Sequence, residues 1–404
     1  MPETGQPQGQ QFYCELFIKG TQYNPKNINY LIIREWIFNI IPTIEIQFLD
    51  DGYLTEVTPL EDGEDIIVTI AKDEDADEVL ELTFALDDYE VGILGDNRKS
   101  LVTFTGHLKM DDLFRVKSRH LSKRNSSAVL ETIASENGIP FKNPHNVTPA
   151  DNMIWYQNGI SNFDFIRHVL KRVYVPNDTC FFYANTNNEF VFTSLLSEMN
   201  KQERLTCKYN VNKFEWNIID DKDPDNTIWF NSYSIVNNSA FFNKLGGYGV
   251  SYSYYNLKGN KQETNISDIT MFSDLSFRNK SCAGCPTKYR WGGDLIEPNV
   301  YGGTYFESRV RNRFLRDNFF AFSLVLNVNA INKINLLDTV DVAIPSLFAD
   351  DDSNEVMSGE YLVAGIQHEI SNNGIYRKKI SVGRNGMNKS PDLTGEYQVE
   401  EKSA

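Results

Sequence analysis

Apolar and polar residues alternate along much of the N-terminal part of the chain. Every second residue is apolar in the stretches 44–48, 80–86 and 102–108. A period of two is typical of antiparallel strands that bury one face. Short stretches rich in Asp, Gly and Asn separate these strands. The pattern predicts a β-barrel or sandwich over residues 12–110.

A helical period replaces this alternation after residue 110. The stretch 126–137 starts at a serine, stops before Gly138 and carries an apolar face formed by Val129, Leu130, Ile133 and Ala134. A second helix is predicted from Ser161, because Asp164 three residues later gives the spacing of a capping box. Two short strands follow, at 180–184 and 190–193. The segment 111–200 is therefore predicted to be an α+β domain.

The next segment, 201–303, is rich in aromatic residues and Asn and has weak periodicity. Within it, 246–255 is consistent with a strand that has one aromatic face. A third helix is expected over about 305–318, since Thr304 and Glu307 have capping-box spacing. Its apolar face would comprise Phe306, Val310 and Phe314, beside a basic stripe of Arg309, Arg313 and Arg316.

Strand patterns return near the C-terminus, at 322–328, 340–344, 361–370 and 376–382. The sequence Asn372-Asn373-Gly374 is a strong hairpin turn, so the last two strands are expected to pair. The predicted fold class is α+β and β-rich, with antiparallel β-barrel-like domains at the two ends of the chain. The predicted divisions are a disordered lead-in (1–11), a first barrel domain (12–110), an α+β domain (111–200), an irregular β-rich domain (201–303), a helix with a second barrel domain (304–386) and a flexible tail (387–404).

Composition indicates a packed, soluble protein. Of the 404 residues, 41% are hydrophobic, yet no apolar run reaches the ~18 residues that a membrane span needs. The first residues lack the basic and apolar regions of a secretory signal. The net charge of −16 argues against tight nucleic-acid binding, although an acidic wall would let DNA slide past. The simpler explanation is that acidity keeps the protein soluble.

No residue pattern predicts a catalytic, cofactor or metal site. Cys282 and Cys285 have C-x-x-C spacing but lack the second pair that a zinc site needs. An odd, sparse set of five cysteines also argues against a disulfide framework. The acid runs at 220–223 and 350–352 are typical of solvated loops, although paired acids could serve glycoside hydrolysis.

Two charged features each have a functional and a structural interpretation. His368 beside Glu369 could form a catalytic pair, but a cross-strand or interface hydrogen bond is favoured. The stripe of Arg309, Arg313 and Arg316 could contact DNA. A solvated face, or pairing with an acidic neighbouring subunit, is favoured for it in so acidic a chain.

Three segments together resemble the central baseplate hub family of contractile-tail bacteriophages, which is related to the hub part of type VI secretion spike proteins. They are the strand and helix at 153–170, the helix and strands at 305–340, and the stretch 359–373. The resemblance implies two similar barrels per subunit. Three subunits would then place six barrels around a channel, with pseudo-six-fold symmetry on one side and three-fold symmetry on the other.

That family resemblance also implies the partners. Such a ring joins a hexameric tail tube to a trimeric central spike, contacts baseplate wedge proteins and lets DNA pass without specific binding. The expected place is the tail baseplate of a virion that is assembled in the host cytoplasm. The strands at 31–48 and 322–344 are expected to carry ring contacts, and no enzymatic activity is expected.

Two alternative functions stay open from the sequence. Abundant Trp, Tyr and acidic residues are also found in carbohydrate-binding or glycan-degrading tail proteins. The hub component of a phage-like contractile injection system is the other alternative, and its spike would have to be a separate chain.

Overall fold

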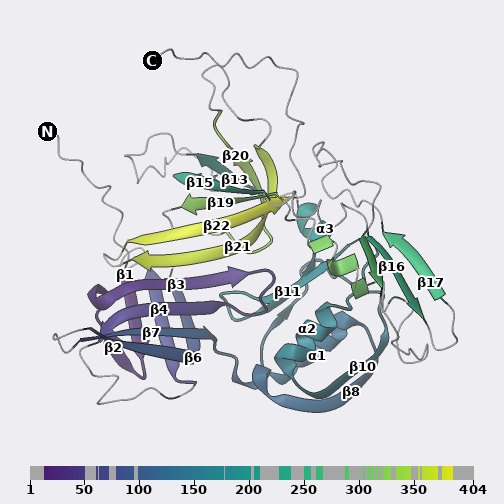
Figure 1. Ribbon diagram of the computed structural model, residues 1–404, viewed down its shortest axis with the longest axis horizontal. Helices are drawn as coiled ribbons and strands as arrows, with labels where there is room; N and C mark the ends of the chain where they lie inside the picture. Colours follow the sequence, from purple (N-terminus) through teal and green to yellow (C-terminus); the bar gives the residue numbers. More distant parts are fainter. Residues whose placement is uncertain are drawn as a thin grey trace.

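The structure is a computed structural model (Figure 1). It describes residues 13–50, 61, 63–71, 79–94, 99–176, 178–201, 204–209, 227–237, 250–255, 261–266, 287–290, 304, 308–309, 311–313, 315–316, 320, 322–328, 334–346, 354, 357–371 and 375–384. The predicted lead-in (1–11) and tail (387–404) lie outside these residues.

The N-terminal part of the chain folds into a curled antiparallel sheet, the first barrel. Its strands are β1 (Tyr13–Ile18), β2 (Thr21–Tyr23), β3 (Ile28–Trp36), β4 (Thr43–Asp50), β5 (Asp65–Ala71), β6 (Val79–Leu94) and β7 (Lys99–Leu108), which pair in the order β2-β1-β5-β6-β7-β4-β3. Ile46 lies opposite Phe104, and both side chains are at most 1% exposed. The predicted strands at 44–48, 80–86 and 102–108 are confirmed, since they lie within β4, β6 and β7.

A second barrel is assembled from strands of several segments. They are β13 (Leu205–Tyr209), β14 (Thr227–Phe230), β15 (Ser232–Asn237), β19 (Phe322–Val328), β20 (Thr339–Ala343), β21 (Gly359–Ser371) and β22 (Tyr376–Arg384), paired in the order β14-β13-β20-β21-β22-β19-β15. Only Asn231 separates β14 from β15, and its N–H donates to the Asn327 carbonyl at 2.9 Å. Because the order returns to one stretch of chain, the sheet closes on itself.

The C-terminal strand predictions are confirmed in this barrel. The predicted stretches 322–328, 340–344, 361–370 and 376–382 correspond to β19, β20, β21 and β22. The predicted turn residues 372–374 lie outside the described residues. The strands on either side pair as a hairpin, and the Ser371 N–H donates to the Ile375 carbonyl at 3.1 Å.

The two barrels share hydrogen bonds, because β21 also pairs with β3. The register runs from Gly365 opposite Trp36 to Ser371 opposite Tyr30, so all these strands belong to one 14-stranded sheet. Figure 1 shows the yellow β21–β22 hairpin alongside the purple β3. The predicted fold class is confirmed: the chain is α+β and β-rich, with two barrel-like sheets. The predicted domain limits stay a prediction, and β13, β14 and β15 come from the segment 201–303.

An α+β part packs beside the first barrel. A two-stranded ribbon of β8 (Val116–Arg124) and β10 (Met153–Ser161) curves around α1 (Ser126–Glu136) and α2 (Asn162–Leu170) (Figure 1). Both predicted helices are confirmed. The cap of α1 is Asn125 rather than a serine, since its side chain accepts from the Ala128 N–H. Ser161 caps α2 by accepting from the Asp164 N–H at 3.0 Å, as the spacing predicts.

Strand β11 separates two hydrophobic cores. It is part of the sheet β11-β12-β9, made of β9 (Phe141–Lys142), β11 (Cys180–Ala184) and β12 (Phe190–Ser194), and the short helix α3 (Leu195–Met199) follows β12. Cys180, Phe182 and Ala184 belong to the core of the first barrel and of helices α1 and α2. Phe181 and Tyr183, on the other face, belong to the core of the second barrel. A strand buried on both faces accounts for the unbroken apolar run in its sequence.

The remaining described elements are η1 (Pro25–Asn27), η4 (Asp111–Phe114) and a separate sheet of β16 (Val250–Tyr255), β17 (Lys261–Ile266) and β18 (Thr287–Arg290). Strand β16 confirms the C-terminal part of the strand considered at 246–255. In the region of the predicted third helix, residues 308–309, 311–313 and 315–316 are helical. Its predicted apolar residues Phe306, Val310 and Phe314, and the capping residue Glu307, lie outside the described residues. Of the helices in the described part of the chain, none has the length and apolar character that crossing a membrane requires.

Candidate functional site at the junction of the barrels

The connection between β3 and β4 ties three parts of the molecule together. Ile37 packs in the second core, whereas Ile40 and Ile41 pack in the first. The Ile37 N–H donates to the Ala364 carbonyl of β21 at 3.0 Å, and the Ala184 N–H of β11 donates to the Ile40 carbonyl at 2.7 Å. Six residues of chain therefore fix both barrels and the α+β part against one another.

Large aromatic side chains lie on the outside of this connection. Trp36 is 37% exposed and Phe38 is 40% exposed. The ring of Phe38 lies 6.0 Å from that of Trp36 and 5.5 Å from that of Phe320, which precedes β19. We call Trp36, Phe38 and Phe320 the aromatic surface. Partly exposed aromatic clusters are enriched where proteins bind one another.

Two glycines on neighbouring strands make room for this aromatic surface. A Cβ atom at Gly365 of β21 would lie 2.0 Å from the Trp36 ring, and one at Gly383 of β22 would lie 2.3 Å from the Phe320 ring. Both rings therefore lie directly on the backbone of the sheet. The absence of a side chain at these two positions sets where the aromatic surface sits.

The predicted arginine stripe is not uniformly a solvated face. Arg316 donates from Nη2 to the Cys180 carbonyl at 2.8 Å, and its guanidinium lies 5.6 Å from the centre of the Phe181 ring. Arg316 thus connects its helical segment to β11 through a hydrogen bond and a cation–π contact. Arg313 is exposed and Arg309 is half-buried, and pairing of these two with a neighbouring subunit stays a prediction.

A second feature of the junction is a set of buried polar side chains that we call the polar seam: Glu35 of β3, His368 of β21 and Lys378 of β22. His368 Nδ1 lies 2.7 Å from the Tyr376 hydroxyl, and its Nε2 lies 3.3 Å from Glu35 Oε1. An ionised Glu35 can only accept, so Nε2 carries the proton and Nδ1 accepts from the Tyr376 hydroxyl.

Burial changes the proton affinity of this polar seam. It lowers the pKa of His368, an effect that the hydrogen bond from His368 Nε2 to Glu35 opposes. Burial also lowers the pKa of Lys378 to about 8, although the nearby carboxylates of Glu35 and Asp338 act in the opposite direction. Both shifts have the same cause, because a low-dielectric interior disfavours the charged form.

The hydrogen-bond interpretation of His368 is confirmed and the catalytic-pair interpretation is wrong. His368 points to the buried face of β21 and bonds across to β22 and β3. Glu369 points to the opposite face and pairs with Lys379 at 2.7 Å. Successive side chains of a strand point in opposite directions, so the two neighbours cannot act on one substrate.

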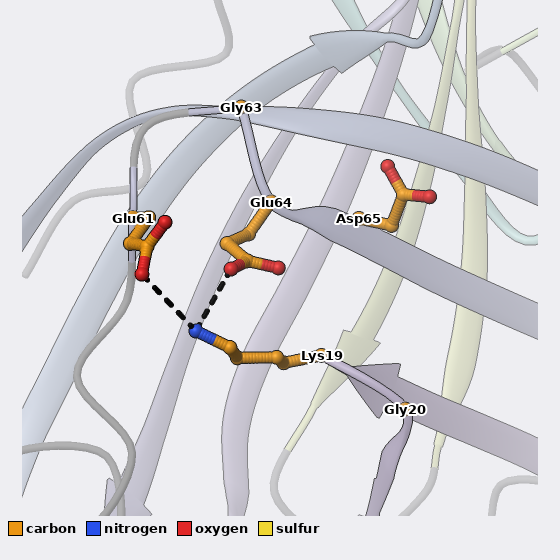
Figure 2. Close-up of a pocket in the computed structure, with 6 residues that line it drawn as sticks. All are labelled: Lys19, Gly20, Glu61, Gly63, Glu64 and Asp65. Atoms are coloured by element: carbon orange, nitrogen blue, oxygen red, sulfur yellow. Dashed lines mark ion pairs between the residues drawn. The ribbon is translucent and has the colours of Figure 1, made fainter.

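A polar hollow lies at the far end of the first barrel (Figure 2). It has a volume of about 450 Å³ and is lined by Lys19, Gly20, Glu61, Gly63, Glu64 and Asp65. Lys19 Nζ lies 2.9 Å from Glu64 and 3.8 Å from Glu61, and Figure 2 shows both pairs. These ion pairs tie the β1–β2 turn to the start of β5, so a structural role accounts for the hollow.

The described residues contain no group of three or more His, Cys, Asp or Glu side chains that could hold a metal ion. Cys282, Cys285 and the acid runs at 220–223 and 350–352 lie outside the described residues. The described residues therefore do not test the predictions of no catalytic, cofactor or metal residue. Burial raises the pKa of Cys14 and of Cys207 to about 12, so these two thiols are unreactive.

Comparison with known proteins finds likeness in structure but not in sequence. No family model and no curated protein matches the chain. A tail protein from Neisseria meningitidis matches with a TM-score of 0.58 at 9% identity, over 93% of this chain and 98% of that one. The 43 kDa tail protein of prophage MuSo2 from Shewanella oneidensis matches with a TM-score of 0.58 at 12% identity, over 93% and 99%. The chain has the fold of these tail proteins.

This common fold extends over almost the whole of each chain, so it includes both barrels and the α+β part. The predicted resemblance to phage tail proteins is confirmed at the level of the fold, and the hub role stays a prediction. An E. coli component of the type VI secretion system matches with a TM-score of 0.49 at 11% identity, over 91% of this chain and 76% of that one. The resemblance to secretion spike proteins stays a prediction.

Proposed function

We propose that the chain is a non-enzymatic structural subunit of a contractile-tail baseplate, in which it forms the central hub. The observation that carries this proposal is the continuous sheet that joins two barrels of one chain through β21 and β3. The same overall fold in two tail proteins supports it. Its place would be the tail of a virion that is assembled in the host cytoplasm.

The hub is proposed to be a homotrimer. Closed cyclic assembly of three chains with two barrels each gives six barrels around one axis, which matches a six-fold tail tube on one face. The chain repeats only three times, so the other face matches a trimeric central spike. Rigid attachment of the two barrels within the chain favours this role, because a flexible linker would not hold six barrels in one ring.

The aromatic surface is the proposed centre of a contact in this assembly. It lies within and beside the strands 31–48 and 322–344, which the sequence resemblance implies for ring contacts. Baseplate wedge proteins and the tail tube are the other proposed partners. The net charge of −16 favours a channel that DNA passes without being bound.

Measurement of the assembled mass tests this proposal. The full chain, alone and co-expressed with its trimeric spike, is expected to give a species of three times the 46.3 kDa subunit and a ring in electron micrographs. A strictly monomeric chain, both alone and with the spike, would overturn the proposal.

Matched substitutions separate the trimer from the contact proposed within it. Phe38→Ser is expected to weaken the trimer at least tenfold, since partly exposed aromatic anchors carry much of an interface's energy. Tyr156→Ser is the control, because Tyr156 is 50% exposed but lies on β10, away from the junction. Equal trimer stability in the two variants would show that the aromatic surface is not part of the trimer interface. It would not contradict the trimer itself.

A further inference from the structure

The polar seam occupies one defined line across the sheet. On β3, Glu35 lies between Ile33 of the first core and Ile37 of the second. On β21, His368 lies in the same way between Ile370 and Ile366. Glu35 is 7% exposed and His368 is 5% exposed, so neither charge-bearing group is on the surface.

The third strand repeats this arrangement. On β22, Lys378 lies between Tyr376 of the first core and Ile380 of the second, and it is 3% exposed. His368 is directly opposite Lys378 in the β21–β22 register. A row of ionisable groups therefore crosses three strands at the one line where the two hydrophobic cores meet.

With Glu35 ionised, the charges of this row balance when only one of the two basic groups is protonated. That group is Lys378, because its pKa is about 8 whereas burial lowers the pKa of His368 below 6.5. With Glu35 ionised, Lys378 protonated and His368 neutral, the three groups sum to zero. Other titratable groups face the row: the Tyr376 hydroxyl, Asp338 before β20, and Tyr183 of β11, whose surroundings include Glu198 of α3. Asp338 and Glu198 both pair with Lys201, at 3.8 Å and 2.5 Å. Among the described residues, Glu35 is the carboxylate that pairs with His368, and it already balances Lys378, so a proton added to His368 leaves an excess positive charge.

We propose that the polar seam is a proton-sensitive joint, which holds the two barrels together at neutral pH and loosens when His368 is protonated. An extra positive charge between two apolar cores is costly unless water or an anion reaches it. Separation of β21 from β3 admits water at that line, and it also draws Ile370 and Tyr376 away from the rest of the first core. This inference does not depend on the proposed hub function.

The direction in which pH changes the stability of the joint follows from the burial of His368. Burial disfavours its protonated form, so the folded joint resists the proton that an exposed histidine takes up near its ordinary pKa of 6.5. The joint is therefore intact above that pH and loses stability as the pH falls below it. Local opening that leaves most of both cores packed costs less than global unfolding, so the seam opens first.

Hydrogen exchange on the full chain tests the joint. Protection of the amides of β3 and of residues 365–371, corrected for intrinsic exchange, is expected to fall at least tenfold between about pH 7.5 and about pH 5. Amides of β4 and β7 inside the first barrel are expected to keep their protection. Equal loss in both sets of amides, or no loss in either, would overturn the proposal without any variant.

Variants assign the response to the polar seam. His368→Gln keeps hydrogen-bonding capacity but does not titrate, so it is expected to remove the fall in protection. Glu369→Gln and Lys379→Met change neighbours on the opposite face and are expected to retain it, as is His168→Gln on α2. A fall that persists in His368→Gln, or that disappears in His168→Gln, would assign the response elsewhere and contradict the joint.

Discussion

The two barrels differ in how the chain builds them. All strands of the first come from residues 13–108, and each pair within it is antiparallel. The second takes strands from 205–237 and 322–384, and it contains the parallel pairs β13–β14 and β13–β20. The first barrel is therefore formed by contacts within one continuous stretch, whereas the second requires two segments that are far apart in the sequence.

This difference has a consequence for folding and for stability. Contacts between residues far apart in sequence carry a larger loop-closure cost and form more slowly. The first barrel is thus expected to form early, and β3 then offers its edge to β21. The two cores on either side of the polar seam should also respond separately to mutation, because their buried side chains form two separate clusters.

The largest expected effect comes from emptying each core in turn. Phe104, 1% exposed and packed on Phe48 with ring centres 5.4 Å apart, belongs to the first core. Leu324, 0% exposed, belongs to the second. Phe104→Ala is expected to cost roughly 3–5 kcal/mol and Leu324→Ala roughly 2–5 kcal/mol in the free energy of unfolding. Urea unfolding with hydrogen exchange measures both.

The location of the loss decides whether the barrels are separate units. Phe104→Ala should lower amide protection in β4 and β7 more than in β19 and β22. Leu324→Ala should give the reverse pattern. If either substitution lowers protection equally in both barrels, the molecule unfolds as one cooperative unit and the distinction between the cores has no energetic meaning.

Sequence patterns predicted three strands of the first barrel and four of the second, but the pairing of only one hairpin in the second. Alternation identified β4, β6, β7 and β19 because each buries one face. It could not place β13 and β14, since their partners lie more than a hundred residues away or come from a segment with weak periodicity. The pairing of β21 with β3 likewise cannot be predicted from the residue pattern of either strand.

The candidate site was predicted in part. His368 was identified, and its cross-strand hydrogen bond was favoured, but Glu35 and Lys378 were missed. A signal for them exists, because each is a charged residue at a buried position of an alternating strand. Glu35, for example, lies between Ile33 and Ile37. Such an interruption is normally interpreted as an edge or a loop. Only the register across three strands reveals that these positions are neighbours: His368 lies opposite Lys378, and Glu35, opposite Ile366, lies diagonally across from His368.

Removal of the buried charge of Lys378 tests the boundary between the two cores. Burial lowers the pKa of Lys378 from 10.5 to about 8, a change that corresponds to roughly 3 kcal/mol. The lowered pKa already includes the favourable effect of Glu35 and Asp338, so the protonated side chain remains unfavourable in the folded chain. Lys378→Met is therefore expected to raise the free energy of unfolding at about pH 7 by roughly 1–3 kcal/mol.

The pH profile identifies the cause of that gain. Between about pH 8 and pH 10.5 the unfolded chain keeps the Lys378 proton while the folded chain has lost it, so wild-type stability rises with pH there. The advantage of Lys378→Met should shrink over the same interval and vanish above it. A constant advantage at every pH would indicate better packing rather than relief of buried charge.

A smaller effect is expected from a helix that packs on only one core. The Ser161 hydroxyl accepts the Asp164 N–H at 3.0 Å, and α2 contributes Phe165, Ile166, Val169 and Leu170 to the first core. Ser161→Ala is expected to cost about 1 kcal/mol, as loss of an N-cap does. Thermal unfolding measures the cost, and Ser161→Thr should restore most of it, because Thr is also a good cap and keeps the hydroxyl that donates to Asp164 Oδ2 at 3.0 Å. Loss of amide protection confined to the second barrel would contradict the assignment of α2 to the first core.

The smallest effect is expected at Lys379, the residue that follows Lys378 on β22. Lys379 pairs with Glu369 at 2.7 Å, but the side chains are 35% and 24% exposed, so water screens the pair. Lys379→Met should therefore change the free energy of unfolding by only ~0.2–1 kcal/mol, and a salt titration should reduce that further. The same substitution at two consecutive positions of β22 would then give a stabilisation at Lys378 and a slight loss at Lys379. If Lys379→Met instead stabilises the chain as much as Lys378→Met, general removal of positive charge explains both results, and the line between the two cores has no special cost.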